Sequence, residues 1–352
     1  MLGRWFPPWW RSVRPSGPYA RLRIGLVADE LTSSCLAFSC NVVHLTPSNY
    51  AAVLRGGSRP DFVFVESAWQ GFRQRWKYRI AAYPDHPERN NAELIRLLDC
   101  ANDAGIPTVF WNKEDSVHFD RFIDSARHAS LILTVDAGCV DRYRAEVGEQ
   151  VRIGVLPFAV QPLIHRYAGI DSNRRSSCFV GSYGTHIHDV RRTRQDLLLG
   201  AAAQELGVNV YDRNSDRRAK HYRFPVMRGQ HIRAKVPHAQ TAAIYKRHLA
   251  CLNVNTIEDS PTMLSRRLLE ILACGGLAVS TPAMSINRHF EGCCHLVDSK
   301  EQAEELFAHL ARDGYDKNDR AMMEEGVQRV LGSHTYDHRL SSILDFLATR
   351  IT

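Results

Sequence analysis

The chain has 352 residues, of which 44% are apolar and 24% are charged, and this suits a globular protein of two ordinary domains. Its formal net charge of +7 favours anionic partners such as nucleotide diphosphates, acidic glycans or anionic lipid. No run of about 18 apolar residues is present, which excludes a predicted membrane-spanning helix. The aromatic residues do not alternate with basic ones as a stacking platform for nucleic acid requires, so we expect no nucleic acid among the partners.

The first 20 residues form a leader that is basic and aromatic, and its character extends to about residue 23. Four prolines prevent a continuous amphipathic helix in this segment. Indole and guanidinium groups together suit the interface of an anionic membrane, so residues 1–23 are a candidate membrane contact. A disordered leader, or an arm packed on its own domain, is the alternative. The aromatic residues are Trp5, Phe6, Trp9 and Trp10, and the basic ones are Arg4, Arg11, Arg14 and Arg21.

Residues 21–168 alternate between short apolar runs and helical stretches, which predicts a parallel sheet covered by helices on both faces. A helix is expected over residues 91–104, where Gly105 follows as a stop signal. This half forms the predicted N-terminal Rossmann-like domain. The expected strands are 22–28, 41–45, 61–66, 107–111, 130–135 and 151–157.

Residues 169–335 repeat the alternation, with a polar and basic linker at 170–176, and they form the predicted C-terminal Rossmann-like domain. The expected strands are 178–181, 208–211, 250–255, 277–280 and 295–297, and the expected helices are 193–206, 241–248, 265–274 and 300–312. Residues 336–352 are predicted to form a separate amphipathic helix at the end of the chain, which could cross back to the N-terminal domain. The fold class is therefore α/β, with two doubly wound domains facing across a cleft and ligands at the carboxyl ends of the strands.

Residues 213–235 interrupt the second alternation with many basic residues and few apolar ones. The segment predicts a long loop, which is either functional or a solvated excursion. Its basic residues are Arg213, Arg217, Arg218, Lys220, Arg223, Arg228, Arg233 and Lys235.

The helix after Ser265 has two distinct faces. Leucine and isoleucine side chains share one face at helical spacing, while Arg266, Arg267 and Glu270 share another. Two cations with a carboxylate one turn later suit a diphosphate and sugar hydroxyls, and Ser260 or Ser265 could cap the helix. A surface Arg–Glu pair is the competing interpretation, and spacing alone does not separate the two.

Residues 255–276, with Thr281-Pro282, resemble the donor-binding signature of GT-B glycosyltransferases. In that signature an Arg-x-aromatic-Glu helix ending in Ala-x-Gly precedes a strand and a threonine; here Leu269 replaces the aromatic residue. Three segments more narrowly resemble the CgeB-like glycosyltransferases, once grouped with spore maturation proteins: residues 107–115, the Ser265-Arg266-Arg267 helix, and residues 334–339. The resemblance implies a GT-B enzyme that transfers a sugar, hexosyltransferase-like, in polysaccharide biosynthesis.

The resemblance also implies that residues 21–168 bind the acceptor and that residues 169–335 bind the nucleotide sugar, and it implies roles for individual residues. It implies that Glu270 holds the ribose and that Arg266 or Arg267 lies near the diphosphate. The strand and turn that open the donor domain add Gly181, Ser182 and Tyr183 as candidates. In the competing interpretation these residues form an ordinary glycine turn after a strand. Asn255 could meet the base or ribose, or only cap a turn. The donor-binding candidates are Gly181, Ser182, Tyr183, Asn255, Ser265, Arg266, Arg267 and Glu270.

An inverting transfer requires a base within reach of the acceptor hydroxyl. Asp29 and Glu30 follow the first predicted strand and Glu66 ends the third, so these are the candidate catalytic residues; helix capping is the alternative for Asp29. Metal is not expected, because neither an Asp-x-Asp motif nor a zinc-like cysteine spacing is present. Scattered cysteines predict free thiols in the cytoplasm, with the inner membrane surface as a peripheral location.

The predicted partners are a nucleotide-sugar donor, such as a UDP-, GDP- or TDP-sugar, and a glycan or lipid-linked acceptor. A non-transferring GT-B enzyme (an epimerase or a phosphorylase) and an inactive glycan-binding or partner-binding module remain alternatives.

Overall fold

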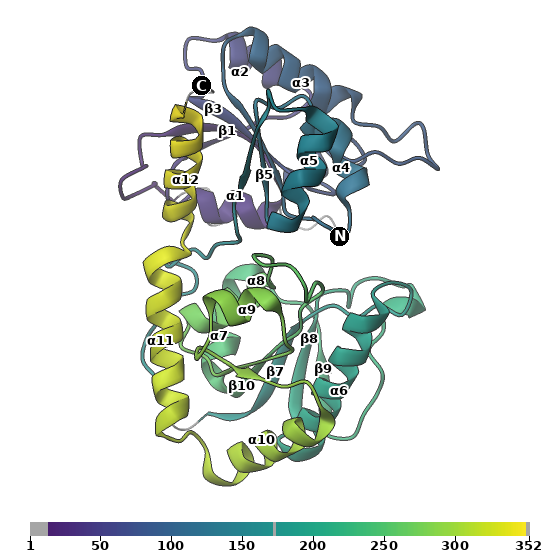
Figure 1. The fold of residues 1–352 in the computed structure, drawn as a ribbon, viewed down its shortest axis with the longest axis vertical. Coiled ribbons are helices and arrows are strands. Elements are labelled where there is room, and N and C mark those ends of the chain that lie inside the picture. The colour runs from purple at the N-terminus through teal and green to yellow at the C-terminus, as the bar shows by residue number, and fades with distance from the viewer. Residues whose placement is uncertain (1–12, 172–173, 350–352) are drawn as a thin grey trace, which may run out of the picture. The chain divides into compact units, whose positions relative to one another are not determined.

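The computed structural model describes residues 13–171 and 174–349. The predicted membrane contact at residues 1–23 therefore falls largely outside the described residues. The chain divides into two compact units. Unit 1 comprises the described residues up to Gln161 together with those from Tyr336 onward, and unit 2 is Pro162–Thr335. In Figure 1 the helices labelled α1 to α5 and the yellow helix α12 belong to unit 1, and those labelled α6 to α11 belong to unit 2.

Unit 1 contains a parallel six-stranded sheet in the order β2-β1-β3-β4-β5-β6. Its strands are β1 (Arg23–Val27), β2 (Asn41–His44), β3 (Phe62–Glu66), β4 (Thr108–Asn112), β5 (Leu131–Thr134) and β6 (Arg152–Val155). Its helices are α1 (Glu30–Leu36), α2 (Tyr50–Arg55), α3 (Ala92–Asp103), α4 (Phe119–Ala126), α5 (Val140–Val147) and α12 (Tyr336–Ala348), with short 3-10 turns at Phe72–Gln74 and Ala137–Cys139. The six strands correspond to the six predicted ones.

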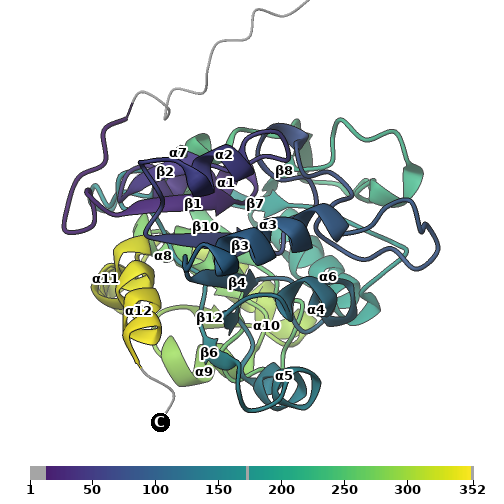
Figure 2. The same cartoon turned by 90° about the horizontal axis from the view of Figure 1, so that it is seen from above.

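Both faces of this sheet are buried, which explains its continuous apolar strands. Along β3, Val63 and Val65 pack against α3 and α4, whereas Phe62 and Phe64 point to the opposite face. Figure 2 shows α3 and α4 on one side of β1 and β3, and α12 on the other.

Unit 2 contains a second parallel six-stranded sheet, in the order β12-β11-β10-β7-β8-β9. Its strands are β7 (Arg175–Gly181), β8 (Val208–Asp212), β9 (Gln230–Arg233), β10 (His248–Asn253), β11 (Ala278–Ser280) and β12 (His295–Leu296). Its helices are α6 (Asp189–Glu205), α7 (His238–Arg247), α8 (Arg266–Ala273), α9 (Met284–His289), α10 (Lys300–Asp313) and α11 (Lys317–Ser333), with a 3-10 turn at Lys220–Tyr222. The fold class is therefore confirmed as α/β with two Rossmann-like sheets.

Three local predictions differ from the structure. Residues 213–235 are not a simple loop, because they include the edge strand β9, which pairs only with β8 and is mostly exposed. The predicted linker at 170–176 ends inside β7. Helix α11 was not predicted; a capping box between Asp316 and Asp319 starts it.

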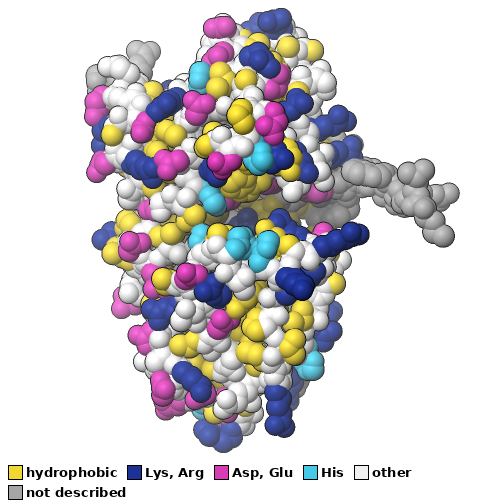
Figure 3. Space-filling view, turned by 90° about the vertical axis from the view of Figure 1, so that its right-hand side faces the viewer, with side chains coloured by type: hydrophobic (Ala, Val, Ile, Leu, Met, Phe, Trp, Pro, Cys, Tyr) yellow, Lys and Arg dark blue, Asp and Glu magenta, His cyan; other side chains and the backbone are white. Residues whose placement is uncertain are grey.

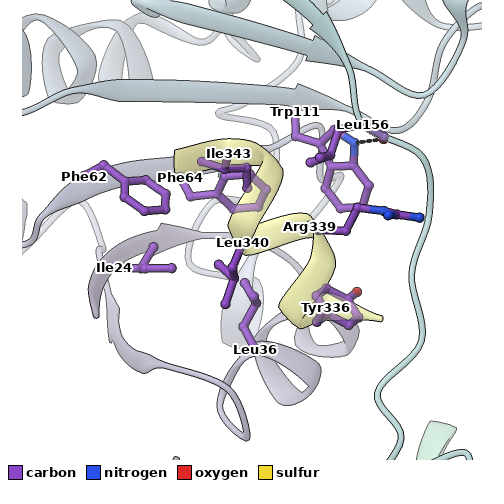
Figure 4. A pocket seen from close by; sticks show the side chains of 10 residues that line it. All are labelled: Ile24, Leu36, Phe62, Phe64, Trp111, Leu156, Tyr336, Arg339, Leu340 and Ile343. Carbon is purple, nitrogen blue, oxygen red and sulfur yellow. Dashed lines mark hydrogen bonds between the residues drawn. The ribbon is translucent and has the colours of Figure 1, made fainter. Parts of the chain in front are cut away.

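Helix α12 packs on the sheet of unit 1, although it follows unit 2 in the sequence (Figure 4). Leu340 and Ile343 lie over an apolar seam lined by Phe62 and Phe64. Arg339 donates from Nε to the Pro157 carbonyl (2.7 Å) and from Nη2 to the Phe158 carbonyl (2.8 Å), and burial lowers its pKa to about 10.

The far end of α12 is held by Arg152, whose Nη1 donates to the carbonyls of Phe346 (2.7 Å) and Leu347 (3.1 Å). These are terminal carbonyls that the helix itself cannot satisfy. None of the helices in the described ranges combines the length and the apolar character needed to span a bilayer.

Candidate functional site

The donor candidates meet at the carboxyl edge of the unit 2 sheet. Strand β7 ends at Gly181, β10 ends at Asn253, and α8 begins immediately after Ser265. In open parallel sheets, ligands bind at this edge because the loops that follow the strands gather there.

Arg267 is anchored between β7 and β10. Its Nε donates to the Val180 carbonyl (2.6 Å), its Nη1 donates to Asn253 Oδ1 (3.3 Å), and its guanidinium carbon lies 4.5 Å from the centre of the Phe179 ring. These contacts hold the guanidinium beside Gly181. A Cβ on Gly181 would lie only 2.9 Å from Arg267 Nη2, so a glycine at this position leaves room for the cation.

Two further arginines add positive charge at this point. The backbone N–H of Arg213 donates to the Gly181 carbonyl (2.9 Å), and its charge acts on both Arg267 and Arg191. The Nη2 of Arg191 donates to the Ser182 carbonyl (3.5 Å). Burial, together with the charges of Arg191 and Arg213, lowers the pKa of Arg267 to about 10. Burial and Arg213 likewise lower the pKa of Arg191. The cluster is electrostatically unfavourable by itself and favours an anion against Gly181 and Ser182.

Glu270 is 5% exposed and ionised. It accepts hydrogen bonds from His238 Nε2 (2.9 Å) and Arg266 Nε (3.0 Å) on Oε1, and from the Tyr245 hydroxyl (3.3 Å) on Oε2. Burial opposes its ionisation, but the hydrogen bond from His238 and the charge of Arg266 outweigh burial and hold its pKa well below the usual range. The competing prediction of an exposed Arg–Glu pair therefore does not describe this carboxylate.

His165 completes the buried cluster around Glu270. Its Nε2 lies 2.9 Å from Thr241 Oγ1 and 3.9 Å from Glu270 Oε2, and burial lowers its pKa to about 4, so the ring is neutral. Donor atoms of His165, His238 and Glu270 lie within 4.8 Å of one another, a spacing compatible with a metal ion. The guanidinium of Arg266 on the same carboxylate oxygen adds positive charge and disfavours a divalent cation at this position.

The remaining donor candidates have structural contacts. Asn255 accepts from Ser265 N (3.2 Å) and donates to the Thr281 carbonyl (2.8 Å), so it shapes the loop leading into α8. Ser265 occupies the N-cap position, although its side chain makes no capping hydrogen bond. The Tyr183 hydroxyl donates to Asp196 (2.9 Å), and the ring is buried. Gly181 and Ser182 lie beside the arginine cluster, whereas Tyr183 points into the core of unit 2.

The catalytic candidates belong to the carboxyl edge of the unit 1 sheet, and two of them lie together. Asp29 N donates to Glu66 Oε1 (3.3 Å), and Asp29 Oδ1 accepts from Gly71 N (2.8 Å). Glu66 is fully buried and forms a 2.5 Å ion pair with Lys113. Glu30 is separate from this group, because it is an exposed residue in the first turn of α1.

Glu114 adds a carboxyl group to this edge. Burial raises its pKa, and the charges of Glu66 and Asp29 raise it further, against the opposing effects of Lys113 and Trp69. His118 lies edge-on to Trp69, with ring centres 5.1 Å apart. Glu114 follows the fourth predicted strand, but spacing in the sequence could not show that it joins Asp29 and Glu66.

Asp115, in the same segment, is buried and accepts hydrogen bonds from three neighbouring side chains. Its carboxylate accepts from Asn112 Nδ2 (2.7 Å), Thr134 Oγ1 (2.6 Å) and the Tyr143 hydroxyl (2.9 Å). Burial raises the pKa of Asp115 to about 7 despite these hydrogen bonds. The network ties β4, β5 and α5 together, which is a structural role.

Comparisons with known proteins match one family model, over residues 191–345, and solved structures over most of the chain. Residues 191–345 match a family model described as "Glycosyl transferase-like". No curated protein matches the chain by sequence.

Solved structures share the fold at low identity. HepE from Anabaena, in complex with UDP and glucose, has a TM-score of 0.56 at 10% identity, over 93% of this chain and 91% of that one. Trehalose 6-phosphate synthase from Burkholderia multivorans has a TM-score of 0.51 at 11% identity, over 82% and 71%. Sucrose-phosphate synthase from Thermosynechococcus elongatus has a TM-score of 0.50 at 12% identity, over 93% of this chain and 98% of that one. The chain has the GT-B fold. The family match adds support for a glycosyltransferase, while the narrower CgeB-like resemblance stays a prediction.

Proposed function

We propose that the protein transfers a sugar from a nucleotide-sugar donor to a hydroxyl group of a glycan or lipid-linked acceptor, without a metal ion. The observation that carries the proposal is the arginine cluster of Arg191, Arg213 and Arg267 at Gly181. Besides burial, the charges of Arg191 and Arg213 lower the pKa of Arg267, and the charge of Arg213 lowers that of Arg191. The cluster therefore favours an anion, and a diphosphate supplies it. The match of residues 191–345 to a glycosyl transferase-like family supports the same assignment.

In this proposal Arg267 and the backbone at Gly181 and Ser182 receive the diphosphate, and Glu270 receives a ribose hydroxyl. A carboxylate offers about four acceptor positions, and three donors already use Glu270. One position remains for a ribose hydroxyl, and the buried donors around it fix the direction of the carboxylate. Asn255 contributes by holding the loop before α8.

The reaction breaks the bond between the sugar's anomeric carbon and the donor phosphate, and it forms a bond from that carbon to the acceptor oxygen. The nucleoside diphosphate leaves with the bonding electrons, and the cation of Arg267 stabilises the developing negative charge. In an inverting transfer the acceptor hydroxyl gives its proton to a carboxylate. Asp29 is the best candidate base, because it is half-buried and less constrained than Glu66, which Lys113 neutralises.

The finer assignments belong to the same proposal. We assign the chain to the CgeB-like glycosyltransferases, as a hexosyltransferase of polysaccharide biosynthesis acting in the cytoplasm or at the inner face of the membrane. The Trp111–Asp115 segment supports this assignment, since its side chains build the group of Glu66, Lys113 and Glu114 at the unit 1 edge.

Thermal unfolding of the full chain with UDP, GDP, TDP and CMP, and with their sugar conjugates, tests the proposal. One nucleotide at about 100 times its dissociation constant should stabilise the protein by about 2.7 kcal/mol. Release of that nucleotide from its sugar conjugate should then depend on an added acceptor. A chain that responds to none of them is not a nucleotide-sugar enzyme. Binding without turnover would indicate the inactive module, and conversion of the donor without acceptor would indicate an epimerase.

A further inference from the structure

The positive charge of the chain is concentrated in one segment. Residues 213–235, hereafter the basic segment, contain eight of the 45 Lys and Arg residues and one of the 38 Asp and Glu residues, so their formal charge is +7. This equals the net charge of the whole chain, and the other residues are balanced. A dispersed basic surface, typical of a soluble enzyme, would not show this distribution.

The structure keeps these charges on the surface of unit 2. The basic segment connects β8 to the edge strand β9 through a loop and one 3-10 turn, and all eight of its cationic residues are exposed. Figure 3 shows dark blue Lys and Arg side chains spread over this side of the unit. Charges on an edge strand prevent pairing with another sheet, which accounts for Arg233 at the end of β9. This effect does not account for the cations of the loop.

Three loop cations are available to a partner. Arg223 donates to backbone carbonyls, including that of Asn214 (3.5 Å), and Lys235 pairs with Asp216. Within the described ranges, by contrast, the side chains of Arg218, Lys220 and Arg228 make no hydrogen bond or ion pair. These three side chains make no contact that stabilises the fold, so their clustering is better explained by contact with a partner.

An apolar tip accompanies these charges. Val226 is 92% exposed, the highest value among the exposed large apolar side chains of the described residues, and it stands between Arg223 and Arg228. Ile232, which is 45% exposed, precedes Arg233. A soluble polyanion would gain little from a valine, and a nucleic acid would use an exposed ring, whereas the Tyr222 ring is covered by Arg217 at 4.6 Å. Exposed aliphatic groups among cations suit the interface of an anionic bilayer.

We propose that the basic segment docks unit 2 on an anionic lipid surface, with Arg218, Lys220 and Arg228 at the headgroups and Val226 at the headgroup–acyl boundary. This contact is separate from the one predicted for residues 1–23. It does not depend on the proposed transfer reaction, although Arg213, at the start of the segment, adjoins Gly181.

Sedimentation of the full chain with vesicles tests the docking. The vesicles are phosphatidylcholine alone, or phosphatidylcholine with about one third phosphatidylglycerol, at low ionic strength. The test variant is Arg218→Gln/Lys220→Gln/Arg228→Gln. The matched control, Arg247→Gln/Arg288→Gln/Lys317→Gln, removes the same charge from exposed residues of unit 2 outside the segment. Because both retain residues 1–23, the leader contributes equally.

Each cation at an anionic surface contributes roughly fivefold in partition, so the test variant should bind anionic vesicles on the order of 100-fold more weakly than wild type. The control should lose at most a few-fold, and Val226→Ser should weaken binding without changing its salt dependence. Equal losses in the test and control variants would overturn the proposal. Equal binding of the wild type to neutral and anionic vesicles would also overturn it. So would a Val226→Ser variant that binds anionic vesicles as well as the wild type, together with a wild-type chain that binds a soluble polyanionic glycan or nucleic acid more tightly than it binds the vesicles.

Discussion

Replacing Arg267 by methionine separates the role of this side chain in folding from its role in binding. The pKa of Arg267 falls from 12.5 to about 10, which corresponds to roughly 3 kcal/mol opposing its charge in the unliganded protein. Because the side chain is partly exposed, solvent screens its charge, and we reduce this free-energy cost to about 2 kcal/mol. Arg267→Met removes this cost, but it also removes the hydrogen bond to the Val180 carbonyl and the contact with Asn253.

A lost hydrogen bond that leaves a partner unpaired costs about 1–3 kcal/mol, so the two effects nearly cancel. We expect the free energy of unfolding to change by no more than about 2 kcal/mol. Binding should respond differently: a charge-assisted contact to a phosphate is worth about 1.5–3 kcal/mol, which corresponds to roughly 10–150-fold in affinity.

Calorimetric titration with the nucleoside diphosphate that stabilises the chain, and with the matching nucleoside, provides the assay. Arg267→Met should weaken the diphosphate and leave the nucleoside unchanged, and the exposed Arg288→Met should alter neither. Arg266→Met separates the two arginines, since Arg266 pairs with Glu270 and should affect the nucleoside as well. Unchanged diphosphate affinity in Arg267→Met would remove this side chain from the phosphate site. A loss of stability above about 4 kcal/mol would show that it is a structural anchor instead.

Three further predictions concern carboxyl groups. Glu270→Gln should weaken the nucleoside and the diphosphate alike, by about tenfold in titration, because the ribose contact is common to both; normal affinity would leave Glu270 a structural role. Asp29→Asn should lower turnover by about 100-fold or more in a nucleotide-release assay and preserve donor affinity, and unchanged turnover would move the base elsewhere. Asp115, with a folded pKa of about 7, binds a proton in the native state between about pH 4 and 7 that the unfolded chain does not, so stability should fall as pH rises through that range. Urea unfolding should show this slope in the wild type and a flatter one in Asp115→Asn; equal slopes would contradict the pKa.

Most of the fold could be predicted because central parallel strands are buried on both faces. Phe62–Glu66 is such a run, and its continuous apolar sequence needs no knowledge of its neighbours. The edge strand β9 was missed for the opposite reason, since it pairs on one side and faces water with basic residues. Helix α11 was missed because its buried positions are few over its 17 residues.

The site was predicted only where its residues share one helix or one turn. Arg267 and Glu270 are three residues apart on α8, so spacing alone brings them together. Arg191 reaches Ser182 from the start of α6, and His238 reaches Glu270 from α7, and neither approach leaves a sequence signal. These approaches arise from tertiary packing, which a single sequence does not encode in any local pattern.

The return of the chain from unit 2 to helix α12 has a consequence for synthesis on the ribosome. At about 5–20 residues per second, residues 162–335 take roughly 10–35 s to emerge after the sixth strand of unit 1 is complete. Throughout that interval the sheet face around Phe62 and Phe64 lacks the helix that covers it. The N-terminal half is thus the first to be made and the last to be finished, and a nascent chain arrested before Tyr336 would present an open apolar face to chaperones or to other chains.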